Sequence, residues 1–298
     1  MAVPSAKPRP AQEEAVLNDK SVQWFVVNPQ SGSYDESLVA EVCAHAESAG
    51  QPIDRIVEVG ADDLPDARSA RGVDRILVMT GDGTVSAVHE ALSGWPGELL
   101  VLPGGTMNLL SRALHGEAEP LDVVDAVLAG KARSIAIPLI TVGEFTAISG
   151  LFAGPTTAWG DVREQLRQVD VKGLVETVPQ AIAATLGEQC VTAQGVPGAY
   201  PAFYLQPGEG GITLFGVRAE GAGDLLAHGW AWLKGDFREG PVDRLGVHEA
   251  LDISGSEAGG TLSLLVDGEK RETSDPAVFS AVQSQVRFLS LNGRANWS

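Results

Sequence analysis

The sequence predicts an α/β protein in which a domain with a parallel sheet is followed by an antiparallel, β-sandwich-like domain. From residue 21 to about residue 133, short apolar segments of strand length alternate with segments of helical period, as in a parallel sheet with helical crossovers. After that point the chain consists mainly of short strand candidates separated by Gly- and Pro-rich turns, which is typical of antiparallel sheets. Glycine-rich loops at the ends of three early strands are the third observation.

The elements of the first half follow from Val-, Ile- and Leu-rich runs and from apolar residues that share one helix face. Within one such helix, Val39, Val42 and Ala46 recur at helical spacing. Thr84 is expected to cap the helix that follows the third strand. The expected strands are 22–27, 53–59, 75–79 and 99–102, and the other expected helices are 35–48, 107–114 and 121–128.

The second half is expected to be mostly strand, interrupted by two helical segments. The change of pattern along the chain predicts a disordered tail over 1–20, a first domain over 21–133 and a second domain over 134–275. The expected strands are 134–142, 145–152, 202–205, 211–219, 247–253 and 261–266, and the helical segments are 161–169 and 179–186.

Composition indicates a globular protein and argues against several function classes. Hydrophobic residues make up 44% of the 298 residues, yet no apolar run approaches the roughly 20 residues needed to span a bilayer. The formal net charge of −18 argues against a nucleic-acid partner, because phosphate backbones bind surfaces rich in Lys and Arg. Cys43 and Cys190 are too few for a disulfide framework or a zinc site. Residues 1–20 lack the layout of a signal peptide, so a cytoplasmic location is expected.

Three loops of small and polar residues, 28–32, 81–84 and 103–108, each follow an expected strand. Because the carboxyl ends of parallel strands meet at one edge of a sheet, these loops are expected to converge. Glycines let the backbone approach a phosphate, and hydroxyl and amide groups supply contacts. The candidate phosphate-binding residues are Asn28, Pro29, Ser31, Gly32, Gly81, Asp82, Gly83, Thr84, Gly104, Gly105, Thr106 and Asn108.

The loop 81–84 is the most informative of the three. An apolar strand ends there and a helix begins at once, so backbone N–H groups at a helix N-terminus are available to an anion. Asp82, flanked by glycines, is placed to hold Mg²⁺, directly or through water, or to orient a nucleophile. The sequence contains neither a P-loop nor a strand-linked dinucleotide fingerprint. The loops also lack lysine, so the charge of a bound triphosphate would be balanced by metal and backbone dipoles.

A second acidic motif, Asp267-Gly268-Glu269, follows the strand 261–266. Asp-Gly between two strands is a strong signal for a tight hairpin, so the residues alone favour a plain turn.

These motifs together resemble those of the diacylglycerol kinase catalytic family, which includes bacterial lipid kinases, sphingosine kinases and ceramide kinases. The three loops match the family's nucleotide motifs in order and spacing, and Asp267-Gly268-Glu269 matches its late acidic motif. The resemblance covers residues 21–291. It implies an ATP-binding α/β domain, a β-sandwich-like domain with the lipid cleft, and a C-terminal segment, about 276–298, that returns to the first domain.

The resemblance also implies a function. The chain is expected to be an ATP- and Mg²⁺-dependent kinase that phosphorylates a primary hydroxyl of a diacylglycerol, ceramide or sphingoid-type lipid. Asp267 or Glu269 is the expected proton acceptor, and Asp82 would act through Mg²⁺ or water. The acceptor is a membrane lipid, so peripheral contact with the inner membrane surface is expected, and a homodimer is possible.

The chain departs from the family pattern at several positions, and two alternative functions stay open. Thr80 stands where the family usually has glycine, Ser86 and Ala87 replace Asn and Glu, and Leu109 replaces Asp. One alternative is an enzyme similar to NAD kinases, which share the Gly-Asp-Gly-Thr loop. The other is a non-catalytic protein that binds a nucleotide or lipid without turnover.

Overall fold

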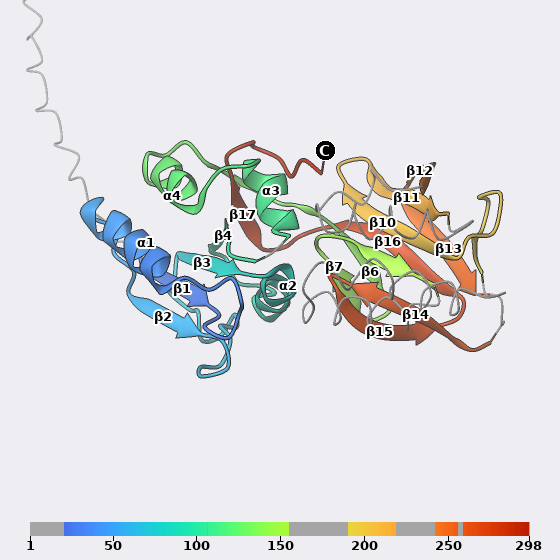
Figure 1. Cartoon of the computed structure of the whole chain (residues 1–298), viewed down its shortest axis with the longest axis horizontal. Helices are drawn as coiled ribbons and strands as arrows, with labels where there is room; N and C mark the ends of the chain where they lie inside the picture. The colour runs from blue at the N-terminus through green and yellow to red at the C-terminus, as the bar shows by residue number, and fades with distance from the viewer. Residues whose placement is uncertain (1–20, 106, 155–189, 219–241, 256–258, 298) are drawn as a thin grey trace, which may run out of the picture.

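The computed structural model describes residues 21–105, 107–154, 190–218, 242–255 and 259–297. Thr106 and the two expected helical segments, 161–169 and 179–186, lie outside these residues. The chain forms an α/β half and a β-rich half that lie side by side (Figure 1). This arrangement is the expected one, with a parallel-sheet domain and antiparallel sheets.

The α/β half is built on a six-stranded sheet with the strand order β2-β1-β3-β4-β17-β5. Neighbouring strands are parallel except for the pair β17 and β5. The strands are β1 (Gln23–Val27), β2 (Arg55–Glu58), β3 (Arg75–Thr80), β4 (Glu98–Pro103), β5 (Arg133–Ile135) and β17 (Arg287–Ser290).

Helices cover both faces of this sheet, which explains why its strands are apolar throughout. On β3, Ile76 and Val78 pack with the helices α2 (Asp82–Ala91) and α3 (Leu109–His115). The intervening Leu77 and Met79 pack on the opposite face. That face is covered by the helices α1 (Glu36–Ser48) and α4 (Pro120–Leu128). The alternation along each strand therefore fills two separate apolar layers.

The strand β17 completes the sheet from the far end of the sequence. It pairs with β4 on one side and β5 on the other, so the chain does return to the first half. The expected segment, about 276–298, starts too early, because residues 277–283 form β16 and pair within the β-rich half. Phe288 and Leu289 are both buried, and they enter the two opposite apolar layers.

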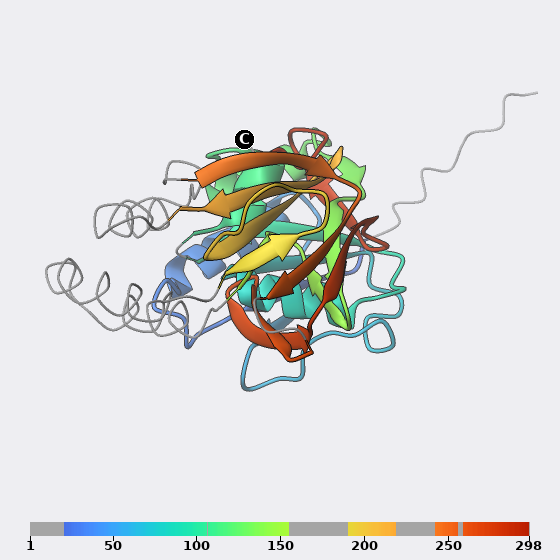
Figure 2. The same cartoon turned by 90° about the vertical axis from the view of Figure 1, so that its right-hand side faces the viewer.

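The β-rich half consists of two antiparallel sheets, with the orders β12-β11-β10-β8-β14-β15 and β7-β6-β16-β13-β9. Figure 2 shows this half facing the viewer. Phe203 and Leu264 of one sheet join Ile253 and Phe279 of the other in one buried cluster. The strands are β6 (Pro138–Val142), β7 (Phe145–Ala147), β8 (Leu151–Ala153), β9 (Val191–Ala193), β10 (Ala202–Gly208), β11 (Gly211–Val217), β12 (Val242–His248), β13 (Ala250–Gly255), β14 (Thr261–Val266), β15 (Glu269–Ser274) and β16 (Ala277–Gln283).

Three strands expected as continuous are each broken in two. The expected strand 134–142 is β5 and β6, because the chain passes there from the first sheet to the second half. The expected strand 145–152 is β7 and β8, and the expected strand 247–253 divides between β12 and β13, which belong to different sheets. The apolar pattern runs on through these breaks, so it did not reveal them.

The predicted cap of α2 is wrong. The helix begins at Asp82 with Gly81 at the N-cap, and Thr84 donates its backbone N–H to the carbonyl oxygen of Gly81 at 3.0 Å. Thr84 therefore lies inside the first turn. No helix among the described residues has the length and apolarity needed to cross a membrane.

Replacing Phe288 by alanine tests the contribution of β17. The ring is fully buried and stacks on His89 of α2 with the ring centroids 5.7 Å apart. We expect Phe288→Ala to lower the free energy of unfolding by about 3–5 kcal/mol, measured by urea denaturation.

Val278→Ala is the control, because this side chain on β16 is 58% exposed and should change stability by less than about 0.5 kcal/mol. Equal losses in the two variants would show that β17 does not hold the first sheet together.

Candidate active site

The three glycine-rich loops lie at the same edge of the first sheet. They follow β1, β3 and β4, which are adjacent and parallel, so all three project beyond the same strand ends. The hydroxyl of Ser33 donates a hydrogen bond to the carbonyl oxygen of Gly104 at 2.7 Å. This bond joins the first loop directly to the third.

The first loop is closed by Asn28. Its side-chain oxygen accepts the backbone N–H of Gln30 at 3.1 Å, and its carbonyl oxygen accepts the N–H of Ser31 at 3.0 Å. The hydroxyl of Ser31 lies 2.9 Å from that of Ser33. Asn28 and Ser31 thus shape the loop through contacts within it and with its neighbour, while Gly32 has open space around its α-carbon.

The second loop leaves the start of α2 without a side-chain cap. Backbone N–H groups in the first turn of a helix have no partner within the helix, and the helix dipole favours an anion there. The amides of Asp82 and Gly83 lie in this turn. The start of α2 is therefore suited to bind a phosphate.

The carboxylate of Asp82 points toward the start of α3. Its two oxygens accept the backbone N–H groups of Leu109 and Leu110, each at 3.2 Å. A negative charge at a helix N-terminus is stabilised by these donors and by the dipole. Asp82 thus joins the second loop to the helix that follows the third.

The third loop is folded around Asn108. Asn108 has a left-handed backbone (φ 52°), and its side-chain oxygen accepts the N–H groups of Gly104 at 3.1 Å and Gly105 at 2.6 Å. Its amide also donates to the carbonyl oxygen of Gly105 at 3.0 Å. The backbone N–H groups of Gly104 and Gly105 are therefore hydrogen-bonded within the loop and hold its shape.

Glycine is required at 104 and 105 because the loop packs against the backbone of β3. A β-carbon at Gly105 would lie 2.7 Å from the α-carbon of Gly81, and one at Gly104 would lie 2.5 Å from the carbonyl carbon of Met79. No side chain fits at these distances. The second and third loops are in direct contact for this reason.

The acidic motif of the second half lies against the second loop. It is a tight turn between β14 and β15 in which Asp267 and Gly268 have positive φ angles of 47° and 87°. The hairpin interpretation is therefore correct. A β-carbon built on Gly83 would lie 3.5 Å from Oε1 of Glu269 and 3.9 Å from the carbonyl oxygen of Asp267. The same turn thus meets the start of α2 across the boundary between the halves.

Asp267 is buried and its carboxylate has four hydrogen-bond donors. The backbone N–H groups of Ile148, Ser149 and Gly150 donate at 2.9, 2.7 and 3.2 Å, and the hydroxyl of Ser86 donates at 2.8 Å. Burial raises the pKa of Asp267 to about 6, and the four donors oppose that rise.

Asp267 and Glu269 therefore differ in what they can do. The lone pairs of Asp267 are taken up by donors from both halves, so this residue fixes the position of the turn. Glu269 is exposed at the first position of β15 and its carboxylate approaches Gly83. Of the two acids, Glu269 is the one that a bound substrate can reach.

Sequence reasoning missed the residues that hold Asp267. Ser86 drew attention only as a departure from the family pattern, and Ile148, Ser149 and Gly150 were placed inside a continuous strand. Gly150 did carry a usable signal, because glycine within a strand often marks a break or a close backbone approach. Its φ is 145°, and a β-carbon there would lie 2.8 Å from the hydroxyl oxygen of Tyr204.

The site suits a metal ion that is bound partly by a carboxylate and partly by the phosphates of a substrate. Among the described residues, no group of three His, Cys, Asp or Glu side chains could hold a metal ion by itself. Mg²⁺ commonly binds through one or two carboxylates together with substrate phosphates. Asp82, the first residue of α2, fits that role.

Comparison with known proteins gives one family match over part of the chain and several structures of similar fold. Residues 23–140 match the family model of the diacylglycerol kinase catalytic domain. A putative diacylglycerol kinase from Bacillus anthracis str. Sterne has the same fold, with a TM-score of 0.63 at 17% identity over 94% of this chain and 98% of that one. A second diacylglycerol kinase structure from that strain gives a TM-score of 0.59 at 16% identity over 91% of this chain and 97% of that one. No curated protein matches the sequence.

Yeast NADH kinase in complex with NADH is a more distant neighbour, with a TM-score of 0.47 at 10% identity over 92% of this chain and 84% of that one.

Replacing Gly105 by alanine tests the packing of the loops. The added methyl group would meet the backbone of Gly81 at 2.7 Å, so we expect a loss of about 1–3 kcal/mol in the free energy of unfolding. Gly32→Ala is the matched control, since nothing lies within 4 Å of its added carbon. If thermal unfolding shows the same midpoint for both variants, the loops do not pack as described.

The raised pKa of Asp267 predicts a pH dependence of stability. The folded state holds its proton up to about pH 6, whereas the unfolded chain loses it near pH 3.8. As the pH rises from about 4 to about 6, the free energy of unfolding of wild type should therefore fall by about 3 kcal/mol relative to that of Asp267→Asn. Above about pH 6 the difference between the two proteins should stay constant. Urea unfolding over this range checks the difference, and an NMR titration of the carboxyl carbon checks the pKa. A pKa below 3.8 would mean that the four donors outweigh burial.

Proposed function

The chain belongs to the diacylglycerol kinase catalytic family through residues 23–140, and on this premise we propose that it is an ATP- and Mg²⁺-dependent lipid kinase. The reaction would transfer the γ-phosphate to a primary hydroxyl of a diacylglycerol, ceramide or sphingoid-type lipid. Because such lipids reside in a bilayer, the enzyme would act at a membrane surface, on the cytoplasmic side.

One observation carries this proposal. The start of α2, suited to a phosphate, and the exposed carboxylate of Glu269 meet across the two halves, with 3.5 Å between the position of a β-carbon at Gly83 and Oε1 of Glu269. Phosphoryl transfer needs a held phosphate and a base beside the attacking hydroxyl. The start of α2 supports the first requirement, and the carboxylate of Glu269 beside it supports the second.

Each residue of the site takes a distinct role in the proposed reaction. The amides of Asp82 and Gly83 bind phosphate oxygens. A metal ion held by the carboxylate of Asp82 together with those phosphates would supply the positive charge that loops without lysine lack. Glu269 accepts the proton of the lipid hydroxyl as its oxygen forms a bond to the γ-phosphorus and ADP leaves. Asp267 positions Glu269 through the turn that the two share.

A row of apolar side chains supports a lipid as the acceptor. Phe215, Tyr204, Phe152 and Leu265 are opposite one another on the adjacent strands β11, β10, β8 and β14. They form an apolar cluster separate from the core between the sheets. The row ends at Leu265, two residues before Asp267, so an acyl chain along it would bring its hydroxyl end toward the acidic turn.

A direct assay tests the function. Full-length protein, labelled ATP and Mg²⁺ are incubated with detergent-dispersed diacylglycerol, ceramide, sphingosine or NAD, and the products are separated by chromatography. We expect a phosphorylated lipid whose formation stops with a chelator and resumes with Mg²⁺. Phosphorylated NAD would favour the NAD kinase alternative, and nucleotide binding without any product would favour a binding protein.

Replacing Glu269 by glutamine tests the assigned base. The amide keeps the shape of the side chain but cannot accept the proton, so we expect kcat to fall about 100-fold to 10,000-fold with nucleotide affinity unchanged. Glu272→Gln is the matched control, an exposed acid on the same strand β15. Activity of Glu269→Gln near that of this control would remove Glu269 from the mechanism.

A further inference from the structure

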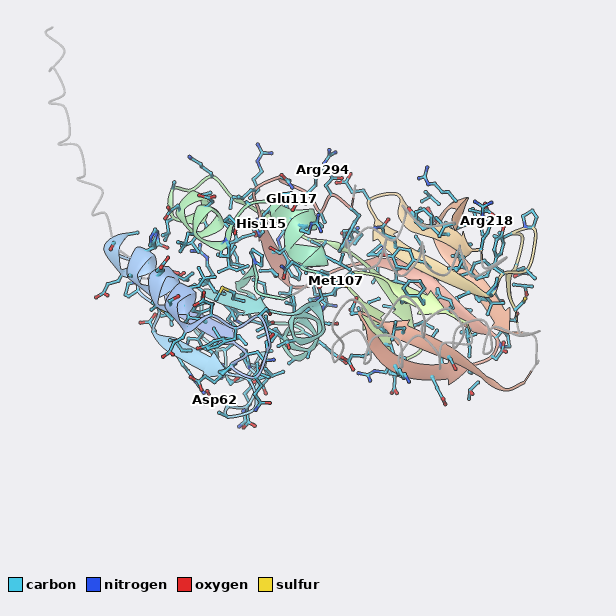
Figure 3. All side chains as sticks on the ribbon, viewed as in Figure 1. Asp62, Met107, His115, Glu117, Arg218 and Arg294 are labelled. Atoms are coloured by element: carbon cyan, nitrogen blue, oxygen red, sulfur yellow. The ribbon has the colours of Figure 1, made fainter. Side chains whose placement is uncertain are left out.

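A cavity of about 630 Å³ lies between the C-terminal segment (residues 291–297) and the sheet strands β10, β11 and β12. Among the residues that the structure describes, none from the three glycine-rich loops or the acidic turn lines it. Figure 3 places Arg294 near α3, at the side of the molecule where the two halves meet. Residues that matter for what the cavity can bind are Arg244, Arg294, Trp297, Thr213, Phe215 and Glu209.

Two exposed arginines line this cavity, although the chain as a whole is strongly acidic. The guanidinium groups of Arg244 and Arg294 form no ion pair or hydrogen bond with any residue that the structure describes, although the chain has a net charge of −18. Glu209 also lines the cavity and is exposed, with no ion pair to either arginine. Two guanidinium groups at one site attract an anion with oxygen atoms that accept paired hydrogen bonds.

The ring of Trp297 supplies apolar surface beside the two arginines. Trp297 is half-buried and lines the cavity together with the buried Ala295. Small-molecule sites commonly combine such apolar walls with a few charged groups.

The C-terminal segment is held in a fixed shape beside the cavity. The backbone N–H groups of Asn292 and Asn296 donate to the carbonyl oxygens of Leu114 and Ala113 at 3.2 and 2.8 Å. The hydroxyl of Ser290 lies 3.0 Å from the carbonyl oxygen of Arg294, to which it donates. These bonds fix the backbone that carries Arg294 and Trp297, so a ligand would meet a preformed site.

We propose that this cavity is a second binding site, specific for a small molecule or lipid headgroup that carries a phosphate monoester. The two arginines bind the phosphate oxygens, and the apolar surface of Trp297 and Ala295 packs against the organic part. The volume is in the range of small-molecule sites, with room for more than the phosphate group alone.

Calorimetry with glycerol 3-phosphate tests the proposal on the full-length chain without nucleotide. We expect saturable binding of one molecule, weakened about tenfold to a hundredfold by Arg244→Gln and by Arg294→Gln. Arg218→Gln is the matched control, since Arg218 pairs with Asp243 at 3.4 Å and does not line the cavity. Figure 3 shows Arg218 toward the far end of the β-rich half. Thermal unfolding confirms that the variants are folded.

A vesicle arm separates a lipid headgroup from a soluble ester. Flotation compares phosphatidylcholine vesicles with and without phosphatidate, using the same variants. Binding in either arm that depends on both arginines supports the site and identifies the source of the phosphate. Absence of binding in both arms, equal binding by all variants, or displacement of glycerol 3-phosphate by ADP would overturn the proposal.

Discussion

One buried carboxylate links the two halves of this protein. Asp267 accepts three backbone N–H groups from the turn 148–150 of its own half and the hydroxyl of Ser86 from α2 of the other half. A buried charge is tolerated only when donors surround it, so α2 and both turns are held in one arrangement. The approach of Glu269 to Gly83 follows from that arrangement, because Glu269 shares a turn with Asp267.

The fold class was readable from the sequence because its signals are local. Apolar runs on β1, β3 and β4 reflect burial on both faces of a parallel sheet, and they match the observed strands to within one residue. The strand β17 has no such signal of its own, since four residues are too few to show a period. Breaks such as the one between β12 and β13 were missed because a change of sheet leaves the apolar pattern unchanged.

The candidate site was predictable to the extent that it depends on strand ends. Parallel strands bring their following loops together, so the convergence at Gly83 and Gly105 followed from topology alone. The contacts that position the acids were not predictable, because they join residues far apart in sequence. Ser86 and Asp267 are separated by 181 positions, and neither residue type indicates a partner at that range. Asn108 was expected to meet a ligand, whereas its side chain folds its own loop.

The central place of β17 also bears on the order in which the chain folds during synthesis. The strand β17, which lies between β4 and β5 in the sheet, leaves the ribosome only after the whole β-rich half has been made. Until then the nascent α/β half has an unpaired edge at β4 and a gap in both apolar layers. We therefore expect the first sheet to close last during co-translational folding, after the β-rich half has been made.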